Sequence, residues 1–303
     1  MTDQRIDQYT RQDPTTLYAD RKPDEQYLEG AGTDAEMAQN VPADHGEDSY
    51  RGSGRLEGRK ALITGGDSGI GAAVAIAFAR EGADVAISYL PEEEQDARRI
   101  VGLIEAAGRT AVVLPGDITS QPWCEELVAK AVEGLGGLDI LVNNAGKQQN
   151  VDAITDLEDD EFDATFRTNV YATFWITKAA VPHLVPGSAI INTTSIQAYA
   201  PSPNLVHYAA TKATVNNLAK GLAAQLAPKG IRVNAVAPGS IWTPLQPAGG
   251  QKPEDLPTTG EQTYLGRWGQ PAELAPAYVF LASGESSYVV GATIHVDGGV
   301  LTP

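Results

Sequence analysis

The chain has 303 residues, 42% of them hydrophobic, and a formal net charge of −17 at pH 7, values that suit one large globular domain. The acidic balance argues against nucleic-acid and anionic-membrane partners, since both need a basic surface. No apolar run approaches the roughly 20 residues of a membrane span, and the one cysteine, Cys124, excludes an internal disulfide and predicts a reducing, cytoplasmic location.

The first 50 residues differ from the rest of the chain, with twelve acidic side chains against four basic ones and few large apolar residues. Such a segment cannot bury a core of its own, so it is either a disordered tail or an extended arm laid on another surface. Possible anchors for an arm are Tyr9, Tyr18, Tyr27, Met37 and Tyr50. We expect residues 1–54 to form an acidic extended arm, ordered against a neighbouring subunit or across its own domain.

From residue 55 onward, strand and helix patterns alternate along the chain. Strands are predicted at 60–64, 84–89, 110–114, 138–142, 188–192, 231–236 and 292–296. Helices are predicted at 70–81, 92–107, 121–134, 157–185, 205–227 and 271–282. Seven strands with intervening helices require a parallel sheet that is covered on both faces. We therefore expect residues 55–303 to form one α/β domain.

The first predicted strand runs into the turn T-G-G-D-S-G-I-G at residues 64–71, and a helix follows. Small residues let the backbone approach a pyrophosphate, and the free N–H groups and dipole of a helix start stabilise its charge. The spacing is G-x-x-x-G-x-G instead of the commoner G-x-G-x-x-G, so the turn alone also fits a strand–helix connection without a ligand.

Three more elements follow in chain order. L-V-N-N-A-G at 141–146 ends an apolar run with two amides and a glycine, a composition suited to lining a cofactor. Asn169 lies inside a long predicted helix, although asparagine is a mediocre helix former. This position fits either a functional residue or an ordinary amide on the protein surface. P-G-S-I-W-T at 238–243 follows a strand and offers backbone groups and a threonine hydroxyl to a carboxamide.

Tyr208 and Lys212 stand one helical turn apart, thirteen residues after Ser195. A free tyrosine has a pKa of about 10 and is a poor base at neutral pH, but a fixed cation nearby favours the phenolate. The Ser195 hydroxyl would hold a carbonyl or alcohol oxygen against the phenol. Tyr-x-x-x-Lys alone is weak evidence for a catalytic pair, because most such pairs lie on an exposed helix face without a function. The histidines show no metal-ligand spacing, and no G-x-S-x-G motif makes Ser195 an esterase serine.

Taken in this order, T-G-x-x-x-G-x-G, N-N-A-G, Asn169, Ser195, Y-x-x-x-K and P-G resemble the short-chain dehydrogenase/reductase family over about residues 55–299. Residues 52–71 and the Y-L-P-E-E segment at 89–93 look like a bacterial subgroup of general-stress and glucose/ribitol-dehydrogenase-like proteins with polar N-terminal extensions. The resemblance implies a Rossmann-type, doubly wound fold with a seven-stranded parallel sheet. It also implies NAD(P)-dependent oxidoreduction by a homotetramer.

The resemblance further implies a catalytic tetrad of Asn169, Ser195, Tyr208 and Lys212. Ser195 would orient the carbonyl oxygen and Tyr208 would protonate it. Lys212 would lower the tyrosine pKa and bind the ribose hydroxyls, and Asn169 would hold a water that relays protons. Besides Tyr208 and Lys212, the expected cofactor contacts are Gly65, Asp67, Ser68, Gly69, Ile70, Gly71, Tyr89, Leu90, Asp117, Ile118, Asn144, Ala145, Gly146, Pro238, Gly239, Ile241 and Thr243.

Cofactor choice is set where the second strand ends, near Ser88-Tyr89-Leu90. A carboxylate there favours NAD, and an arginine pairs with the 2′-phosphate of NADP. The chain has neither signature, but missing basic partners leave a phosphate poorly compensated and Asp67 would repel it. NAD is therefore favoured over NADP.

The sequence says less about the substrate than about the cofactor. Residues 244–266 are polar and rich in Pro and Gly, which predicts a mobile lid. Besides Ser195, we expect Gln197, His207 and Trp242 to face the substrate, which is a small aldehyde or ketone or else a sugar or polyol. A nucleotide-sensing or scaffold protein on the same fold is the alternative function, and the intact tetrad argues against it.

Overall fold

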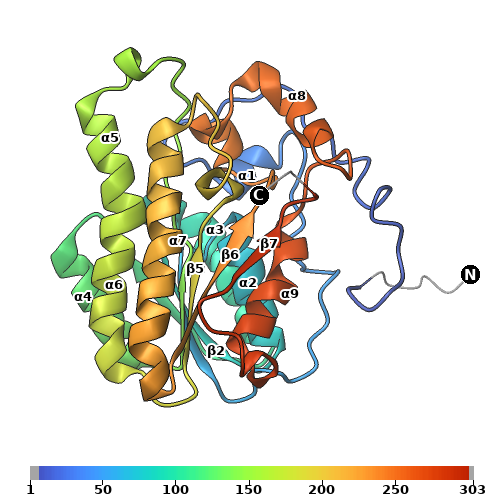
Figure 1. Cartoon of the computed structure of the whole chain (residues 1–303). Coiled ribbons are helices and arrows are strands. Elements are labelled where there is room, and N and C mark those ends of the chain that lie inside the picture. The colour runs from blue at the N-terminus through green and yellow to red at the C-terminus, as the bar shows by residue number, and fades with distance from the viewer. Residues whose placement is uncertain (1–6, 300–303) are drawn as a thin grey trace, which may run out of the picture.

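A seven-stranded sheet forms the centre of the computed structural model, which describes residues 7–299 (Figure 1). Its strands lie in the order β3-β2-β1-β4-β5-β6-β7, and every neighbouring pair is parallel. The strands are β1 (Lys60–Thr64), β2 (Asp84–Tyr89), β3 (Ala111–Pro115), β4 (Ile140–Asn143), β5 (Ala189–Thr193), β6 (Arg232–Pro238) and β7 (Thr293–Val296). This order confirms the predicted doubly wound, Rossmann-type fold.

The middle residues of the inner strands are mostly apolar because both sheet faces are covered. Ala61, Leu62 and Ile63 of β1 are fully buried, although neighbouring side chains point to opposite faces. Short buried strands of this kind were predictable from their apolar runs, and the predicted bounds agree with the structure to within about two residues.

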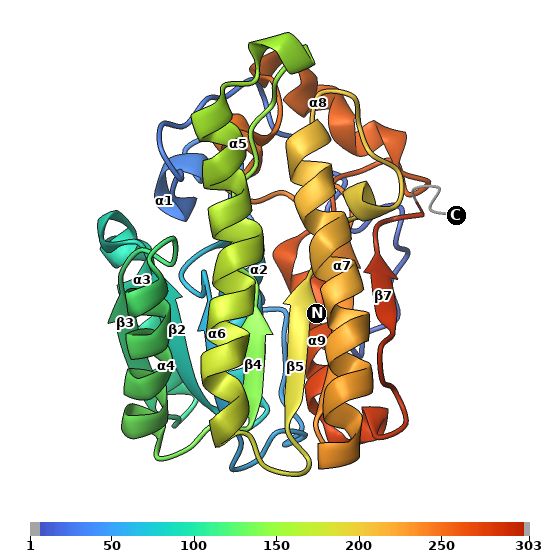
Figure 2. The ribbon, with the colours of Figure 1, turned by 60° about the vertical axis from the view of Figure 1, so that its left-hand side comes forward.

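The helices cover the two faces of the sheet in separate layers (Figure 2). One layer contains α2 (Gly69–Arg80), α3 (Glu94–Ala106) and α9 (Pro271–Ala282), whose apolar side chains share a core with β1 and β2. The other layer contains α4 (Gln121–Leu135), α5 (Asp159–Phe166), α6 (Ala172–Ala180) and α7 (Val206–Leu226). All strands therefore end at one edge, where α1 (Asp34–Met37) and α8 (Leu256–Thr259) also lie.

The predicted helix at 157–185 is present as helical backbone from Asp159 to Ala180, but its hydrogen-bond pattern changes in the middle. It divides into α5 and α6, with a π-helical turn at Arg167–Tyr171 between them, and α6 ends at Ala180. Pro182 explains the early end, since proline has no N–H to continue the helical hydrogen bonds. The π turn contains Asn169, and such turns often occur at functional positions.

The N-terminal residues lie across the chain's own sheet domain. Apart from α1, the described part up to residue 54 has turns but no helix or strand of its own. Met37 and Tyr50 are buried, and the Tyr18 hydroxyl donates to Asp44 Oδ2 at 2.5 Å. Tyr9 and Tyr27 are 52% and 64% exposed, so these two expected anchors are not buried in the chain itself.

Within residues 7–299, no helix is long and apolar enough to cross a bilayer.

Candidate active site

A cavity of about 390 Å³ opens where the strands end, between the glycine turn, the start of α7 and the segment after β6. Of the predicted site residues, its walls contain Gly65, Asp67, Ser68, Gly69, Ile70, Tyr89, Leu90, Asp117, Ile118, Asn144, Ala145, Gly146, Ser195, Gln197, Tyr208, Lys212, Pro238, Gly239, Ile241 and Thr243. Residues from across the sheet are thus brought to one place, as expected for the carboxyl ends of parallel strands.

The glycine turn is shaped so tightly that side chains do not fit into it. Gly65 and Gly69 have positive φ, at 61° and 49°. A Cβ on Gly71 would lie 1.8 Å from the Gly65 carbonyl oxygen, so Gly71 allows the close packing of helix and strand without lining the cavity. A Cβ on Gly69 would lie 3.0 Å from Thr243 Cγ2. At Gly65 and Gly69 the turn therefore presents bare backbone to the cavity.

Hydrogen bonds from the N-N-A-G segment fix this turn. The Asn144 side-chain amide donates to the carbonyl oxygens of Thr64 and Gly65, both at 3.1 Å. Thr64 Oγ1 accepts from the backbone N–H groups of Asn144 and Ala145. Ser68, at the N-cap of α2, makes no side-chain capping bond, which leaves the N–H groups of the first turn available to an anion. These features fit a dinucleotide pyrophosphate.

Tyr208 and Lys212 extend from the first turns of α7 to the cavity wall, beside Ser195 at the end of β5. The Ser195 side chain lies close enough to the Tyr208 phenol to lower its pKa, and both residues belong to the cavity wall. Ser195 Oγ also accepts from the Gln197 backbone N–H at 3.1 Å, which fixes its rotamer. Lys212 Nζ lies 5.6 Å from the centre of the Tyr208 ring and donates to the Thr193 carbonyl oxygen at 3.0 Å.

Burial determines how these groups titrate. It raises the pKa of the Tyr208 phenol to about 12, although the neighbouring Ser195 hydroxyl acts in the opposite direction. Burial also lowers the pKa of the Lys212 ammonium to about 8. The sequence suggested that Lys212 would lower the tyrosine pKa, whereas the groups that shift it here are burial, which raises it, and Ser195, which lowers it less. At neutral pH Tyr208 is therefore a protonated acid.

Asn169 lies behind the cavity wall and positions the backbone of Lys147, which belongs to that wall. Its Oδ1 accepts from the Lys147 N–H at 2.7 Å, and its Nδ2 donates to the Lys147 carbonyl and to Thr211 Oγ1, both at 2.9 Å. A Cβ on Gly146 would lie 3.4 Å from Lys212 Nζ and 3.5 Å from Asn169 Oδ1. Asn169 thus holds the backbone next to Lys212. The relay water that the resemblance implies at this residue remains a prediction.

Two predicted substrate contacts, Trp242 and His207, are not among the described residues that line the cavity. Trp242 is fully buried and its Nε1 donates to the Val41 carbonyl oxygen at 2.8 Å. Its neighbour Ile241 lines the cavity, and successive residues in extended backbone point to opposite sides. His207 precedes Tyr208 on a helix and so lies about 100° around it, in a buried position that lowers its pKa. Both expectations are corrected.

Sequence reasoning missed a carboxylate at the end of β2. Glu93 lines the cavity beside Asp67 and accepts from the Leu90 N–H at 2.8 Å. Burial raises the pKa of Glu93 to about 7, and burial together with the Glu93 charge raises the pKa of Asp67. Asp67 Oδ2 has no hydrogen-bond partner within the described chain. The P-E-E-E run at 91–94 was the available signal, but it did not show which glutamate turns inward.

The predicted lid at 244–266 is folded into short helical turns instead of an open loop. These turns include α8, whose first residue, Leu256, is fully buried. Lys252 Nζ pairs with Asp152 at 2.6 Å. The cavity side of this region adds Gln246 and Gln251, which the sequence reasoning did not assign. Gln148, also unassigned, and the predicted Gln197 are the other glutamines of the wall. Ala31 of the N-terminal segment also lines the cavity, and no motif marked it.

Comparisons with known proteins agree with this arrangement. A family model described as "Enoyl-(Acyl carrier protein) reductase" matches residues 65–301. The uncharacterized oxidoreductase YghA of Escherichia coli is 56% identical over 95% of this chain and 97% of its own. General stress protein 39 of Bacillus subtilis is 50% identical over 83% and 87%. The glucose and ribitol dehydrogenase of Daucus carota is 40% identical over 85% and 90%. These names confirm the predicted subgroup.

Solved structures agree as well. A short-chain dehydrogenase from Burkholderia cenocepacia in complex with NADP superimposes with a TM-score of 0.76, at 37% identity, over 81% of this chain and 99% of its own. A 3-ketoacyl-(acyl-carrier-protein) reductase from Brucella melitensis complexed with NADH gives a TM-score of 0.72, at 36% identity, over 80% and 98%. Similar chains are thus known with either type of nicotinamide cofactor.

Proposed function

Because this chain belongs to the short-chain dehydrogenase/reductase family and is an NAD(P)-dependent oxidoreductase, we propose that Tyr208 is the proton donor and acceptor of its reaction. The reaction interconverts a carbonyl and an alcohol. The observation that carries the proposal is that Ser195 and the buried Tyr208 share one cavity wall, with Lys212 Nζ 5.6 Å from the centre of the Tyr208 ring.

The cofactor would be held by the bare backbone of the glycine turn, the start of α2 and the N-N-A-G segment. The nicotinamide, when bound, supplies or accepts the hydride. Thr243 and the backbone after β6 line the same cavity and would contact the carboxamide. The Lys212 ammonium keeps protons that can be donated besides its bond to the Thr193 carbonyl, and these would bind ribose hydroxyls.

In the reductive direction, Ser195 Oγ donates a hydrogen bond to the substrate carbonyl oxygen and holds it against Tyr208. The phenol then delivers its proton to that oxygen, and a protonated tyrosine with a pKa of about 12 is in the form this step requires. As negative charge develops on the phenol, the neighbouring Lys212 ammonium stabilises it. Asn169 keeps residues 146 and 147 in place next to this lysine.

We propose NAD(H) as the preferred cofactor. Asp67 and Glu93 line the cavity where the second strand ends, so a 2′-phosphate there would meet carboxyl groups instead of an arginine. The unpartnered Asp67 Oδ2 would instead accept from a ribose hydroxyl. Among the described residues of the cavity wall, the cations are Lys147 and Lys212. Lys147 pairs with Glu161 at 3.1 Å and Lys212 lies beside Tyr208. Neither lysine is therefore placed to pair with a 2′-phosphate.

The four glutamine side chains on the wall favour a substrate with hydroxyl groups. An amide both donates and accepts hydrogen bonds, as a hydroxyl does. Gln197 is fixed by two bonds to Ser202, and Gln148 donates to the Gly250 carbonyl at 2.9 Å. Gln246 Oε1 is buried without a partner in the described chain. A sugar, polyol or hydroxyaldehyde is therefore a better substrate than a plain aldehyde or ketone.

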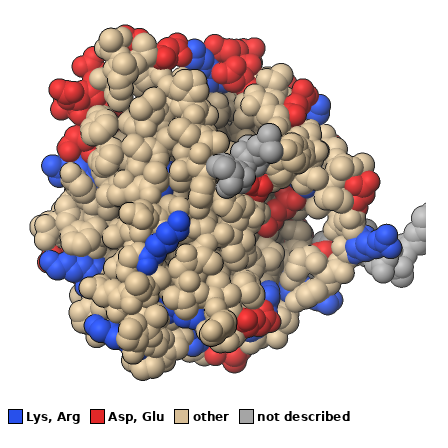
Figure 3. Space-filling view, in the orientation of Figure 1, with Lys and Arg blue, Asp and Glu red and all other residues tan. Residues whose placement is uncertain are grey.

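The proposed assembly is a cytoplasmic homotetramer. β7 is the edge strand of the sheet, and packing with a symmetry mate would cover it together with α9. The face over α5, α6 and α7 also exposes Phe162, Phe174 and Val206, and Figure 3 shows a broad area there with few charged side chains. The single cysteine, buried as a free thiol, suits the reducing cytoplasm.

A turnover panel tests the function. The full-length protein is mixed with NADH or NADPH and with matched carbonyl pairs that differ only in their hydroxyl groups, such as glyceraldehyde and propanal. We expect oxidation of NADH with the hydroxylated member of each pair preferred. A roughly tenfold preference for NADPH would overturn the cofactor assignment, and equal rates for the pairs would overturn the substrate assignment. Light scattering that gives a monomer mass would overturn the tetramer.

A further inference from the structure

The N-terminal segment contacts the substrate-side loop directly. The Leu28 N–H donates to the Pro247 carbonyl oxygen at 3.0 Å, and its side chain is buried. A Cβ built on Gly32 would lie 3.1 Å from Ala248 Cβ, so the two backbones pack closely at this point. Leu28 and Met37 share an apolar cluster with Trp242, Leu256 and Trp268. The loop at 245–250 is thereby held between the arm and the cavity.

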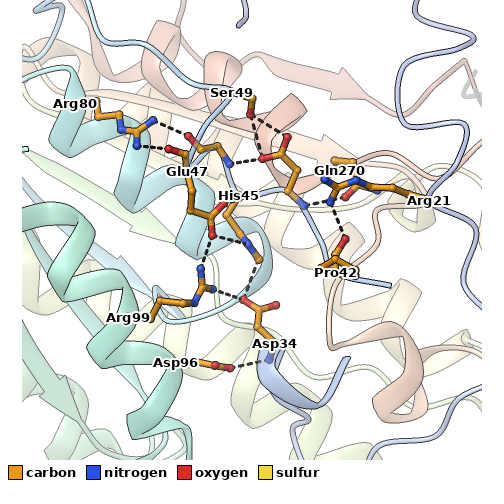
Figure 4. A network of polar contacts seen from close by, with 12 residues as sticks. Arg21, Asp34, Pro42, His45, Glu47, Ser49, Arg80, Asp96, Arg99 and Gln270 are labelled. Atoms are coloured by element: carbon orange, nitrogen blue, oxygen red, sulfur yellow. Dashed lines mark hydrogen bonds and ion pairs between the residues drawn. The ribbon is translucent and has the colours of Figure 1, made fainter. Parts of the chain in front are cut away.

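The same segment is fixed on the other side of the cavity, at α3. The Asp34 N–H donates to Asp96 Oδ2 at 2.7 Å, and Asp34 Oδ2 lies 3.0 Å from Arg99 Nη2 and 2.9 Å from His45 Nε2. Glu47 pairs with both His45 and Arg99. Figure 4 shows how these side chains converge from the arm and from α3. The network is largely buried at Asp34 and His45, which makes it a firm attachment.

Between these two attachments the arm passes the cavity. Ala31 belongs to the cavity wall together with Asp67, Glu93 and Ala248. The residue is also exposed to solvent, as expected at the rim of the cavity. In Figures 1 and 2, α1 lies beyond the carboxyl ends of the strands, where the cavity opens. Residues 28–34 thus connect the substrate-side loop to the end of β2 across the opening.

We propose that residues 28–34 form a strap that positions the loop 245–250 over the cofactor cavity and must separate from that loop for the dinucleotide to enter and leave. The inference rests on the proposed function, because it takes the dinucleotide as the ligand of this cavity. The rate of cofactor exchange is then limited by the contacts that Leu28 and Gly32 make with the loop.

A reversible crosslink tests the strap. Cysteines in place of Gly32 and Ala248 would have their Cβ atoms about as close as a disulfide requires, after a shift of a few tenths of an ångström. The native Cys124 is buried, so it does not compete. Stopped-flow fluorescence then measures the release of bound NADH from the same variant, oxidised and reduced. We expect oxidation to slow release roughly tenfold or more and a reductant to restore it.

The single variant Gly32→Cys is the control for oxidation and for the strain of a side chain at φ +70°. Equal release rates in the oxidised and reduced double variant overturn the strap. Failure of the wild-type protein to bind either reduced cofactor would instead contradict the proposed function.

A second pair of variants covers the case in which the cysteine variants do not fold. Leu28→Ala removes the buried anchor, whereas Tyr27→Ala removes an exposed neighbour. Faster NADH release in Leu28→Ala alone supports the strap, and an unchanged release rate refutes it.

Discussion

In the sheet domain, the strands that end at the cavity are held by continuous apolar packing, and Ile63, Ile87 and Val142 are completely covered. The arm reaches the same cavity with a single helical turn and with anchors at isolated positions. Leu28, Met37 and Tyr50 are buried, and charged groups such as His45 hold the chain between them. The domain therefore distributes its stability over many contacts, whereas the arm concentrates it in a few. Substitutions in the two regions should therefore differ in their effects on cofactor binding and on unfolding free energy.

The largest effect is expected at the glycine turn. Gly71→Ala places a Cβ 1.8 Å from the Gly65 carbonyl oxygen, so the turn must move and the dinucleotide cradle is lost. We expect NADH affinity to fall by roughly 100-fold or more in a fluorescence titration. Gly102→Ala is the matched control, since nothing lies within 4 Å of that position in α3. It should leave affinity unchanged and stabilise the helix by about 0.5–1 kcal/mol.

The junction between arm and domain comes next. Glu81 is fully buried and accepts hydrogen bonds from Tyr50, Ser53 and Arg55, which hold the pKa of its carboxyl down to about 2 against the effect of burial. Glu81→Gln leaves Arg55 with only the more exposed Glu285, at 3.6 Å, as a charge partner and should cost about 3–5 kcal/mol of unfolding free energy.

The matched control for this junction is Glu126→Gln, which breaks an exposed pair with Lys130. It should cost less than about 1 kcal/mol in the same denaturant titration. Equal losses in the two variants would show that the junction is no stronger than a surface pair.

The anchors of the arm itself should differ according to their burial. Met37 is 1% exposed in the cluster around Trp242, so Met37→Ala should cost about 2–5 kcal/mol. Tyr27→Ala at an exposed position of the same arm should cost little. Thermal melts of the two variants decide this, and a similar melting temperature for both would mean that the arm is a passive tail.

The smallest effect is a pH dependence. Burial lowers the pKa of His45, but the Asp34 charge and hydrogen bonds with Asp34 and Glu47 outweigh burial and raise it to about 9. The unfolded value is about 6.5, so the stabilisation is complete below that pH and is lost as the pH rises through about 9. Wild-type stability should exceed that of His45→Gln by up to about 3 kcal/mol at pH 6, and the difference should shrink toward pH 10.

His183→Gln, at an exposed histidine, is the control for this pH series and should show no such trend. A difference between wild type and His45→Gln that stays constant over the same pH range would contradict the assignment of the charge to His45.

These two regions also differ in how far the sequence predicts them. The apolar runs of β1 and β2 and the glycine turn repeat simple local patterns, so their positions were predictable. The spacing of Tyr208 and Lys212 likewise follows from one helical turn. Glu93, Ala31 and the burial of Trp242 away from the cavity depend on where the chain goes outside the strands and helices, which no local period encodes. The same holds for the arm, because its anchors pack against residues more than 200 positions away, as Val41 does with Trp242.

The rate of the Tyr208→Phe variant tests the central claim most directly. The substitution removes only the transferable proton, so cofactor binding and melting temperature should match those of the wild-type protein. Turnover with the best substrate of the panel should fall by about 10²–10⁴-fold. A variant that binds NADH normally and keeps more than half of the wild-type rate would contradict the account.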